Sequence, residues 1–259
     1  MDRSARYPVL GFLALIAALL FIRPALAVNY ACGNPSSGHC YGVTQWTEKP
    51  EYFGAYTDIT QVEMGCPSGC NGFVDDEIWL TDSHTAGCKT NGFGQCWVEA
   101  GYFFLDGAKN KNYFWAESKP GKSAAFTLHT LGTAGPNGAI NHYMLIKDAR
   151  GAAGVFQIWI YNTSLSTLYH GTSNNNLMAG DRILLGQELA GTNGASAAKA
   201  HFTRNIWAVK ALGPEYVFWY NTQIHDGSVT SQNPPFASWA VHPGPPPPEG
   251  GDFTTHCCQ

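Results

Sequence analysis

The chain has 259 residues, of which 44% are hydrophobic, 13% aromatic and 13% charged, and 29 are glycine. A chain rich in glycine and aromatic residues but poor in charge is typical of a β protein with many turns, not of a helical protein. The formal net charge of −4 comes without any Lys/Arg run. Such a surface would repel a phosphate backbone, so we expect no nucleic acid partner.

The first 27 residues have the features of a secretory signal peptide. Arg3 and Arg6 make a basic start, residues 9–22 form an apolar stretch of 14 residues, and residues 25–27 (Ala-Leu-Ala) supply a small-x-small cleavage site. The apolar stretch is too short to span a bilayer comfortably. We therefore predict cleavage before Val28 and a secreted protein, extracellular or periplasmic, with no membrane contact after cleavage.

All eight cysteines follow the predicted cleavage site: Cys32, Cys40, Cys66, Cys70, Cys88, Cys96, Cys257 and Cys258. An even number of cysteines in a secreted chain favours disulfides over metal or redox chemistry. We predict the local pairs Cys66–Cys70 and Cys88–Cys96. Cys32 and Cys40 then pair either with each other or with Cys257 and Cys258. A zinc site that uses His39 or His256 beside these cysteines is the alternative.

Short strand-like runs bounded by Gly, Pro, Asn or Asp clusters follow one another along most of the chain. They cover residues 41–47, 54–63, 73–82, 96–105, 112–118, 124–130, 140–147, 155–162, 182–190, 200–210 and 216–221. Only residues 163–170 and 193–200 could form a helical turn or two. This pattern predicts an all-β domain of two packed antiparallel sheets over residues 28–242. The Pro/Gly-rich residues 243–259 are predicted to leave that domain as a tail with a terminal cysteine pair.

Two of the predicted strands carry a glutamate among apolar residues. Glu99 shares a strand face with Trp97 and Gly101, and Glu188 shares one with Gly186, because alternate residues of a strand point to one side. A buried carboxylate is costly unless it is paired, hydrogen-bonded or protonated. A glycine beside it leaves room for a substrate backbone. Two such carboxyl groups facing one cleft could perform acid–base hydrolysis, whereas the alternative is two ordinary glutamates on a solvated sheet face.

Both segments resemble motifs of a known family. Residues 98–102 (Val-Glu-Ala-Gly-Tyr) resemble the Ile-Glu-Ala-Gly-Trp motif of the plant neprosin-type glutamic peptidases, and residues 186–188 (Gly-Gln-Glu) resemble their Gly-Gly-Glu motif. Other segments follow the family's order, over residues 54–59, 77–80, 113–115 and Trp159. More distantly, the chain is similar to the fungal eqolisins, which have glutamine at the first of these positions and glutamate at the second.

This resemblance implies a two-sheet, antiparallel jelly-roll or concanavalin-like sandwich and a secreted acid endopeptidase. Its catalytic residues would be Glu188, as the base that takes a proton from water, and Glu99, as the proton-bearing partner, on neighbouring or facing strands of one concave sheet. Trp97, Trp115 and Gln187 are candidates to line the substrate cleft, with simple packing as the alternative. We accordingly expect a polypeptide substrate, no cofactor and no metal; the oligomeric state stays open.

Other functions suit the same architecture. A non-catalytic carbohydrate-binding or structural secreted protein is the main alternative, because fold alone does not select a function. The run Asp75-Asp76-Glu77 suggests either a calcium site or a solvated strand entry. We interpret this run as lacking the alternating carboxylates, two residues apart on one strand face, that glycosidases of this architecture use. The sequence also has no Gly-x-Ser-x-Gly elbow of the kind that serine hydrolases need.

Overall fold

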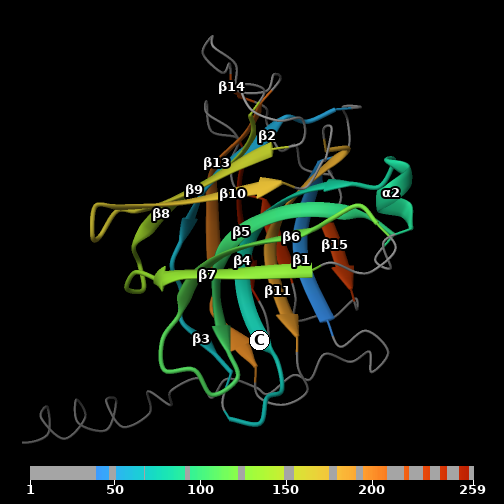
Figure 1. Ribbon diagram of the computed structural model, residues 1–259. Helices are drawn as coiled ribbons and strands as arrows, with labels where there is room; N and C mark the ends of the chain where they lie inside the picture. The colour runs from blue at the N-terminus through green and yellow to red at the C-terminus, as the bar shows by residue number, and fades with distance from the viewer. Residues whose placement is uncertain are drawn as a thin grey trace, which may run out of the picture.

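The computed structural model describes residues 39–46, 51–66, 68–90, 94–121, 126–148, 155–174, 180–190, 195–208, 219–221, 230–233, 240–243 and 251–256. These residues form mainly strands, which assemble into two large antiparallel sheets (Figure 1). The predicted all-β, two-sheet antiparallel sandwich is thus confirmed.

The first sheet has seven strands in the order β15-β1-β11-β4-β5-β6-β7. Its strands are β15 (Thr230–Asn233), β1 (His39–Trp46), β11 (Arg182–Ala190), β4 (Phe73–Asp82), β5 (Cys96–Leu105), β6 (Asn112–Ser118) and β7 (Phe126–Thr133). Strands β4, β5, β6 and β7 follow one another in sequence, whereas β11 comes from much later in the chain and pairs with the free side of β4. Strand β4 is therefore flanked by the two strands that carry Glu99 and Glu188.

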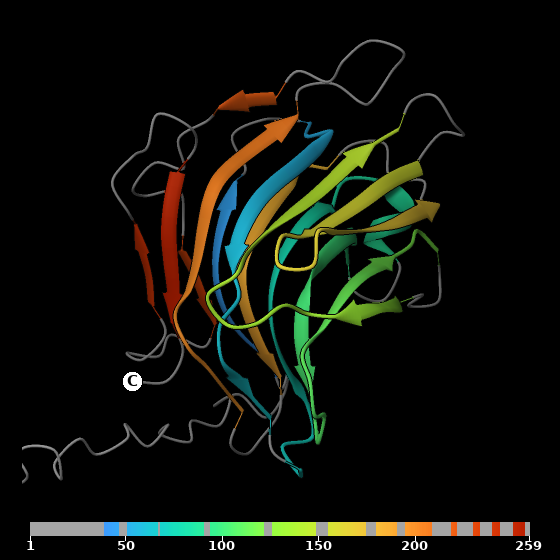
Figure 2. The ribbon, with the colours of Figure 1, turned by 90° about the vertical axis from the view of Figure 1, so that its left-hand side faces the viewer.

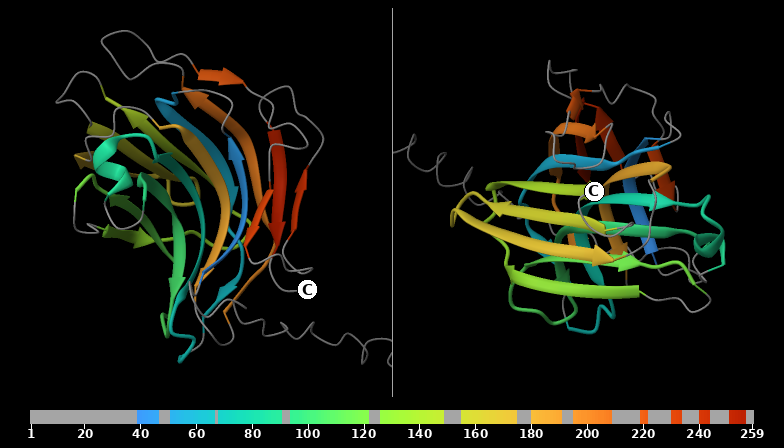
Figure 3. Two further views of the ribbon diagram at one scale, coloured as in Figure 1. Left: turned by 90° about the vertical axis from the view of Figure 1, so that its right-hand side faces the viewer. Right: turned by 45° about the horizontal axis from the view of Figure 1, so that its top comes forward.

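The second sheet has eight strands and follows the order β10-β9-β8-β2-β13-β17-β16, with β14 paired to β13. Its strands are β10 (Thr167–Asn174), β9 (Val155–Asn162), β8 (Ile140–Lys147), β2 (Gly54–Thr60), β13 (Ala200–Ala208), β17 (Gly251–His256), β16 (Ala240–Pro243) and β14 (Trp219–Asn221). A further two-stranded sheet joins β3 (Met64–Gly65) to β12 (Ser196–Ala197). The strands bend along their length, and the sheets lie as two curved layers (Figures 2 and 3).

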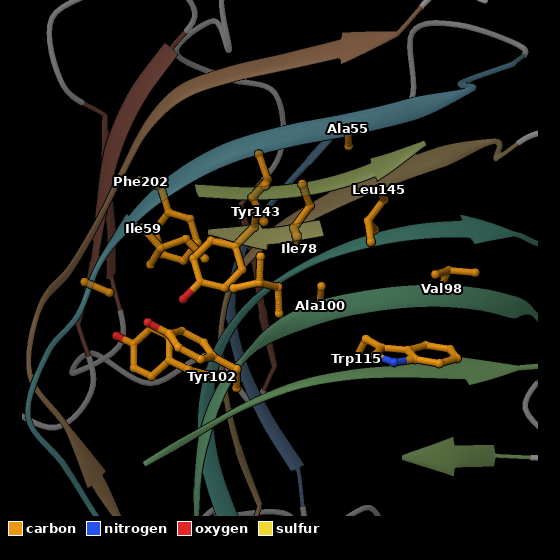
Figure 4. Packing of buried hydrophobic residues seen from close by; sticks show 14 of the residues in the cluster. Ala55, Ile59, Ile78, Val98, Ala100, Tyr102, Trp115, Tyr143, Leu145 and Phe202 are labelled. Atoms are coloured by element: carbon orange, nitrogen blue, oxygen red, sulfur yellow. The ribbon is translucent and has the colours of Figure 1, made fainter. Parts of the chain in front are cut away.

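The main hydrophobic core lies between the two layers. Alternate residues of each strand supply it, so that on β4 Val74, Ile78 and Leu80 are completely buried in this core. Figure 4 shows Ile78 and Ala100 from the first sheet close to Tyr143 from the second. Burial of each such aliphatic side chain is worth about 1.5–3 kcal/mol. The period of two then forces the intervening residues of β4 onto the outer face of the first sheet.

Two disulfides are present among the described residues. Cys66 pairs with Cys70 and Cys88 pairs with Cys96, with Cα–Cα distances of 5.6 and 4.9 Å. Both predicted local pairs are confirmed. Cys88 lies in the short helix α2 (Ala86–Lys89), at one edge of the molecule (Figure 1). Cys32, Cys257 and Cys258, and the side chain of Cys40, lie outside what the structure describes, so their pairing stays a prediction.

Two predictions about the later part of the chain were wrong. Residues 163–170 make no helical turn; residues 163–166 form a hairpin turn, with Ser166 at a φ of 51°, and residues 167–170 are the first part of β10. The Pro/Gly-rich tail does not leave the domain at residue 243, because β17 pairs with both β13 and β16. Phe253 of β17 is 1% exposed and stacks on Phe202 in the main core, which explains why this strand is retained in the sheet.

The predicted signal peptide, residues 1–27, lies outside the described residues, and its cleavage stays a prediction. Within the part of the chain that the structure describes, no helix has the length and apolar character needed to cross a membrane.

Candidate active site

Glu99 and Glu188 lie on the same face of the seven-stranded sheet. Glu99 on β5 is in register with Trp79 of β4, and Glu188 on β11 is in register with Asp75 of β4. Residues paired across antiparallel strands point to one side, and Trp79 and Asp75 share a side because they are an even number of residues apart. The two glutamates were expected on neighbouring or facing strands of one sheet, and they lie on one face of one sheet, on the two strands that flank β4.

Strand β4 adds two further carboxyl groups to this face. Asp75 and Glu77 alternate with the buried Val74 and Ile78, so both point outward with Glu99 and Glu188. We call Asp75, Glu77, Glu99 and Glu188 the four-carboxyl cluster. Asp75 also accepts a hydrogen bond from the backbone N–H of Glu188, with an N···O distance of 3.2 Å. The prediction that this strand lacks alternating carboxylates two residues apart was therefore wrong.

Glu77 occupies the middle of the cluster, between two glycines. It is in register with Gly186 on one side and Gly101 on the other. A Cβ at Gly101 would lie 2.7 Å from the Cβ of Glu77, so the space that this glycine leaves is used by Glu77. A Cβ at Gly186 would meet the backbone of Val43 at 2.6 Å. Gly101 therefore permits close packing against Glu77, and Gly186 permits the close approach of β1, where we had expected room for a substrate.

The cluster is almost completely removed from solvent. Asp75 is 4%, Glu77 1%, Glu99 8% and Glu188 7% exposed. Burial, followed by the charge on Glu188, raises the pKa of Glu99 to about 8, although hydrogen bonds from Trp79 and Trp97 oppose the shift. Burial and the neighbouring carboxylates also hold the pKa of Asp75 and of Glu77 well above the ordinary range. The cluster therefore retains protons at neutral pH.

Trp97 lies beside Glu99 on the same face, and its predicted role in a substrate cleft stays a prediction. It is partly exposed on the same face, and its ring is 6.2 Å from that of Phe126 on the edge strand β7. Phe126 and Leu128 are 49% and 41% exposed. Register puts both on the face that carries Glu99, so they form an accessible apolar border to the cluster.

Trp115 and Gln187 point the other way, which corrects their predicted place in the cleft. Trp115 is part of the main core and stacks on His129 at a centroid distance of 3.8 Å. Gln187 is completely buried and donates a hydrogen bond to Asp76, with an Nε2···Oδ1 distance of 2.9 Å. The hydroxyl of Tyr102 also donates to Asp76. Because neighbours in a strand point to opposite sides, a residue next to Glu188 cannot share its face.

Asp76 points to the opposite side of β4 from Asp75 and Glu77, and the burial of all three corrects the reading of this run as a solvated strand entry. The carboxyl group of Asp76 lies on the core side, where burial raises its pKa to about 7 despite hydrogen bonds from Tyr102 and Gln187. The three neighbours therefore cannot bind one calcium ion together.

Two groups of described side chains bring three potential ligand atoms within 4.8 Å of one another. One is Asp75, Glu77 and Glu188, and the other is Asp82, His84 and Asp181. In the second group, Asp82 accepts hydrogen bonds from backbone N–H groups of the following turn, and Asp181 accepts them from Ser83. Proximity of acidic groups does not by itself define a metal centre, and we assign neither group as one. The expected absence of a metal stays a prediction.

Comparison with known proteins identifies relatives in fold. No protein-family model and no curated protein matches the chain. Two crystal structures of scytalido-glutamic peptidase, both with transition-state analogues, match with a TM-score of 0.52 and 8% identity, over 84% of this chain and 98% of the other. SCP-B, an eqolisin-family peptidase in complex with a tripeptide, matches with a TM-score of 0.49 and 9% identity over the same shares.

At this level of identity, the likeness shows a shared fold. The resemblance to eqolisins is therefore confirmed for the β-sandwich architecture, and the resemblance to neprosin-type peptidases stays a prediction. The structure further brings in Asp75 and Glu77, which the sequence analysis had not placed at the site. The even spacing of the apolar Val74, Ile78 and Leu80 was the available signal, because it puts Asp75 and Glu77 on the other face of the strand.

Proposed function

We propose that this protein is a secreted acid endopeptidase that uses Glu99 and Glu188 to activate water. The observation that carries this proposal is a pair of buried glutamates on one sheet face. Glu99 has a pKa of about 8 and is therefore protonated at acidic and neutral pH. Glu99 and Glu188 are also the most exposed members of the four-carboxyl cluster. They are therefore the members best placed to meet a substrate.

The proposed reaction divides acid and base work between these two side chains. Glu188, as carboxylate, removes a proton from a water molecule while the water oxygen bonds to the peptide carbonyl carbon. Glu99, as neutral acid, donates a hydrogen bond to the oxyanion that forms. The proton on Glu188 then passes to the peptide nitrogen, the C–N bond breaks, and a carboxyl and an amine product leave. Both glutamates return to their starting protonation states.

The apolar border beside Glu99 supports a substrate with hydrophobic side chains. Trp97, Phe126 and Leu128 offer partly exposed apolar surface on the face that carries the glutamates. Packing of a substrate side chain there would remove apolar area from water on both partners, which favours binding. We therefore propose a preference for an aromatic or aliphatic residue near the cleaved bond.

The test incubates the mature protein with an unfolded protein substrate from about pH 2.5 to 7 and follows peptide products by mass spectrometry. Glu188→Gln should abolish cleavage, because an amide does not accept the proton of water. Glu99→Gln should retain a part of the activity, because its amide still donates a hydrogen bond to the oxyanion. Glu51→Gln, which changes an exposed glutamate outside the cluster, is the matched control and should cleave as the wild type does. Full activity of Glu188→Gln would refute the proposed mechanism.

Glycoside hydrolysis is a second candidate, favoured by one specific observation. Asp75 and Glu77 stand two residues apart on one strand face and share it with two glutamates, and paired carboxyl groups are the equipment of glycosidases. Incubation with soluble β-glucans and detection of reducing sugar tests this candidate. Release of sugar without peptide cleavage would replace the peptidase proposal, and retention on a polysaccharide column without cleavage would favour a carbohydrate-binding protein.

A further inference from the structure

We infer that Glu77 is a positioning residue, which in its neutral form donates a hydrogen bond to the carboxylate of Glu188 and holds it in place as the base. This inference rests on the proposed function for its catalytic meaning. The protonation of Glu77 and its hydrogen bond to Glu188 can both be measured without any substrate.

Strand pairing puts Glu77 within reach of Glu188. Oxygen atoms of Asp75, Glu77 and Glu188 lie within 4.8 Å of one another. The residues paired with Glu77 on the two adjacent strands are Gly186 and Gly101, which have no side chains. No side chain of a paired residue therefore separates the carboxyl group of Glu77 from the other carboxyl groups of the cluster.

The surroundings of Glu77 favour the neutral acid. Both of its carboxyl oxygens are buried, and no N–H or hydroxyl group of the described residues donates to either. The titratable groups that act on it are Asp75 on its own strand, Glu188 on β11 and Glu99 on β5, and all three are acidic. An ionised Glu77 would therefore lack both a donor and an opposite charge among the described residues, which is an expensive state for a buried carboxylate.

A neutral Glu77 has a proton to give, and Glu188 is the neighbour that the proposed reaction needs as an anion. A carboxylic acid that donates to a carboxylate makes a short, charge-assisted hydrogen bond. Such a bond fixes the orientation of the carboxylate that accepts it. With 1% of its surface exposed, Glu77 acts through Glu188 and does not contact the substrate.

The experiment compares two substitutions of similar size. Glu77→Gln keeps an N–H donor for Glu188, whereas Glu77→Met fills the space without any donor. Infrared spectra of each protein near neutral pH record the carbonyl stretch of protonated carboxyl groups. In both Glu77 variants, the carbonyl band should lose the intensity of one protonated carboxyl group. In Glu188→Gln, Glu77 is still present, but the frequency of its carbonyl band should shift because its hydrogen-bond partner has changed. Unchanged band intensity in both Glu77 variants would overturn the inference.

Kinetics test the positioning role. For Glu77→Met we expect kcat to fall about tenfold, with KM little changed. Glu77→Gln should recover most of this loss. A structural role alone would lower the activity of both variants equally at every pH, which would refute the positioning role. So would activity that depends on an added divalent cation and disappears with a chelator, because Glu77 would then be a metal ligand.

The two proposals fail in different ways. If the wild type cleaves no peptide but the infrared result holds, the proton assignment stands, while the peptidase function and the positioning role both fall. If the wild type cleaves peptides but the band intensity is unchanged in the Glu77 variants, the endopeptidase stands and Glu77 is a packing residue. Urea unfolding of each variant at the assay pH confirms that the proteins compared are folded.

Discussion

Replacing Glu99 with glutamine should make the protein more stable at alkaline pH and leave its stability at acidic pH nearly unchanged. The folded state raises the pKa of Glu99 from 4.5 to about 8, so the folded protein binds this proton more tightly than the unfolded chain does. The resulting stabilisation is fully present below about pH 4.5 and is lost as pH rises through about 8. At 1.36 kcal/mol per pKa unit, the loss is about 5 kcal/mol.

Glutamine cannot ionise, and it can still accept hydrogen bonds from Trp79 and Trp97, which reach Glu99 in the wild type. The free energy of unfolding of Glu99→Gln should therefore exceed that of the wild type by several kcal/mol above pH 8 and match it near pH 4.5. Urea unfolding followed by tryptophan fluorescence at several pH values measures both quantities. Asp76, whose pKa is about 7, adds a pH dependence of the same sign that persists in the variant. Parallel pH curves for variant and wild type would refute the assignment of this proton to Glu99.

Three other substitutions test the packing that supports the site. Gly101→Ala should destabilise by about 1–3 kcal/mol or more in urea unfolding, because its Cβ would lie 2.3 Å from the carbonyl oxygen of Asp76; a stability equal to wild type would contradict this close packing. Phe253→Ala should cost about 3–5 kcal/mol, whereas a cost below 1 kcal/mol would mean that β17 is dispensable to the core. Replacing Cys88 and Cys96 together with serine should cost about 2–3 kcal/mol, seen as a lower melting temperature in calorimetry; an unchanged temperature would show that this crosslink adds no stability.

The local pattern predicted strands well where hydrophobic alternation and turn residues agree. Six strands begin and end at the predicted residues: β4 (73–82), β5 (96–105), β6 (112–118), β8 (140–147), β9 (155–162) and β11 (182–190). Strand β10 was missed because its two faces do not differ clearly in polarity. Its buried residues include Gly171 and Ser173, which are not apolar enough to signal a buried face, whereas the apolar Leu168 is exposed. Strand β17 was missed because a single buried aromatic residue, Phe253, marks it.

The site was predictable only in part, for a physical reason. Period two assigns residues to faces within one strand, and it correctly grouped Trp97 with Glu99. The same rule puts Gln187 on the face opposite Glu188, where the structure has it, so the mistake was to keep Gln187 as a cleft candidate. The order β11-β4-β5, by contrast, depends on pairing between segments far apart in sequence, which no local pattern encodes. Glu77 therefore acquires its place between Gly101 and Gly186 only when these three strands are assembled.

The position of β17 has a consequence for the kinetics of folding. This strand, residues 251–256, lies between β13 and β16 and contributes Phe253 to the core next to Phe202. Contacts between such distant segments require closure of long loops, and topologies dominated by them fold slowly. During synthesis, residues 200–205 of β13 would wait with one edge unpaired until these late residues emerge, because β14 pairs only with residues 206–208. An unpaired strand edge invites aggregation. A chaperone that shields the edge of β13 would raise the yield of folded protein more than one that acts on β4 and β5.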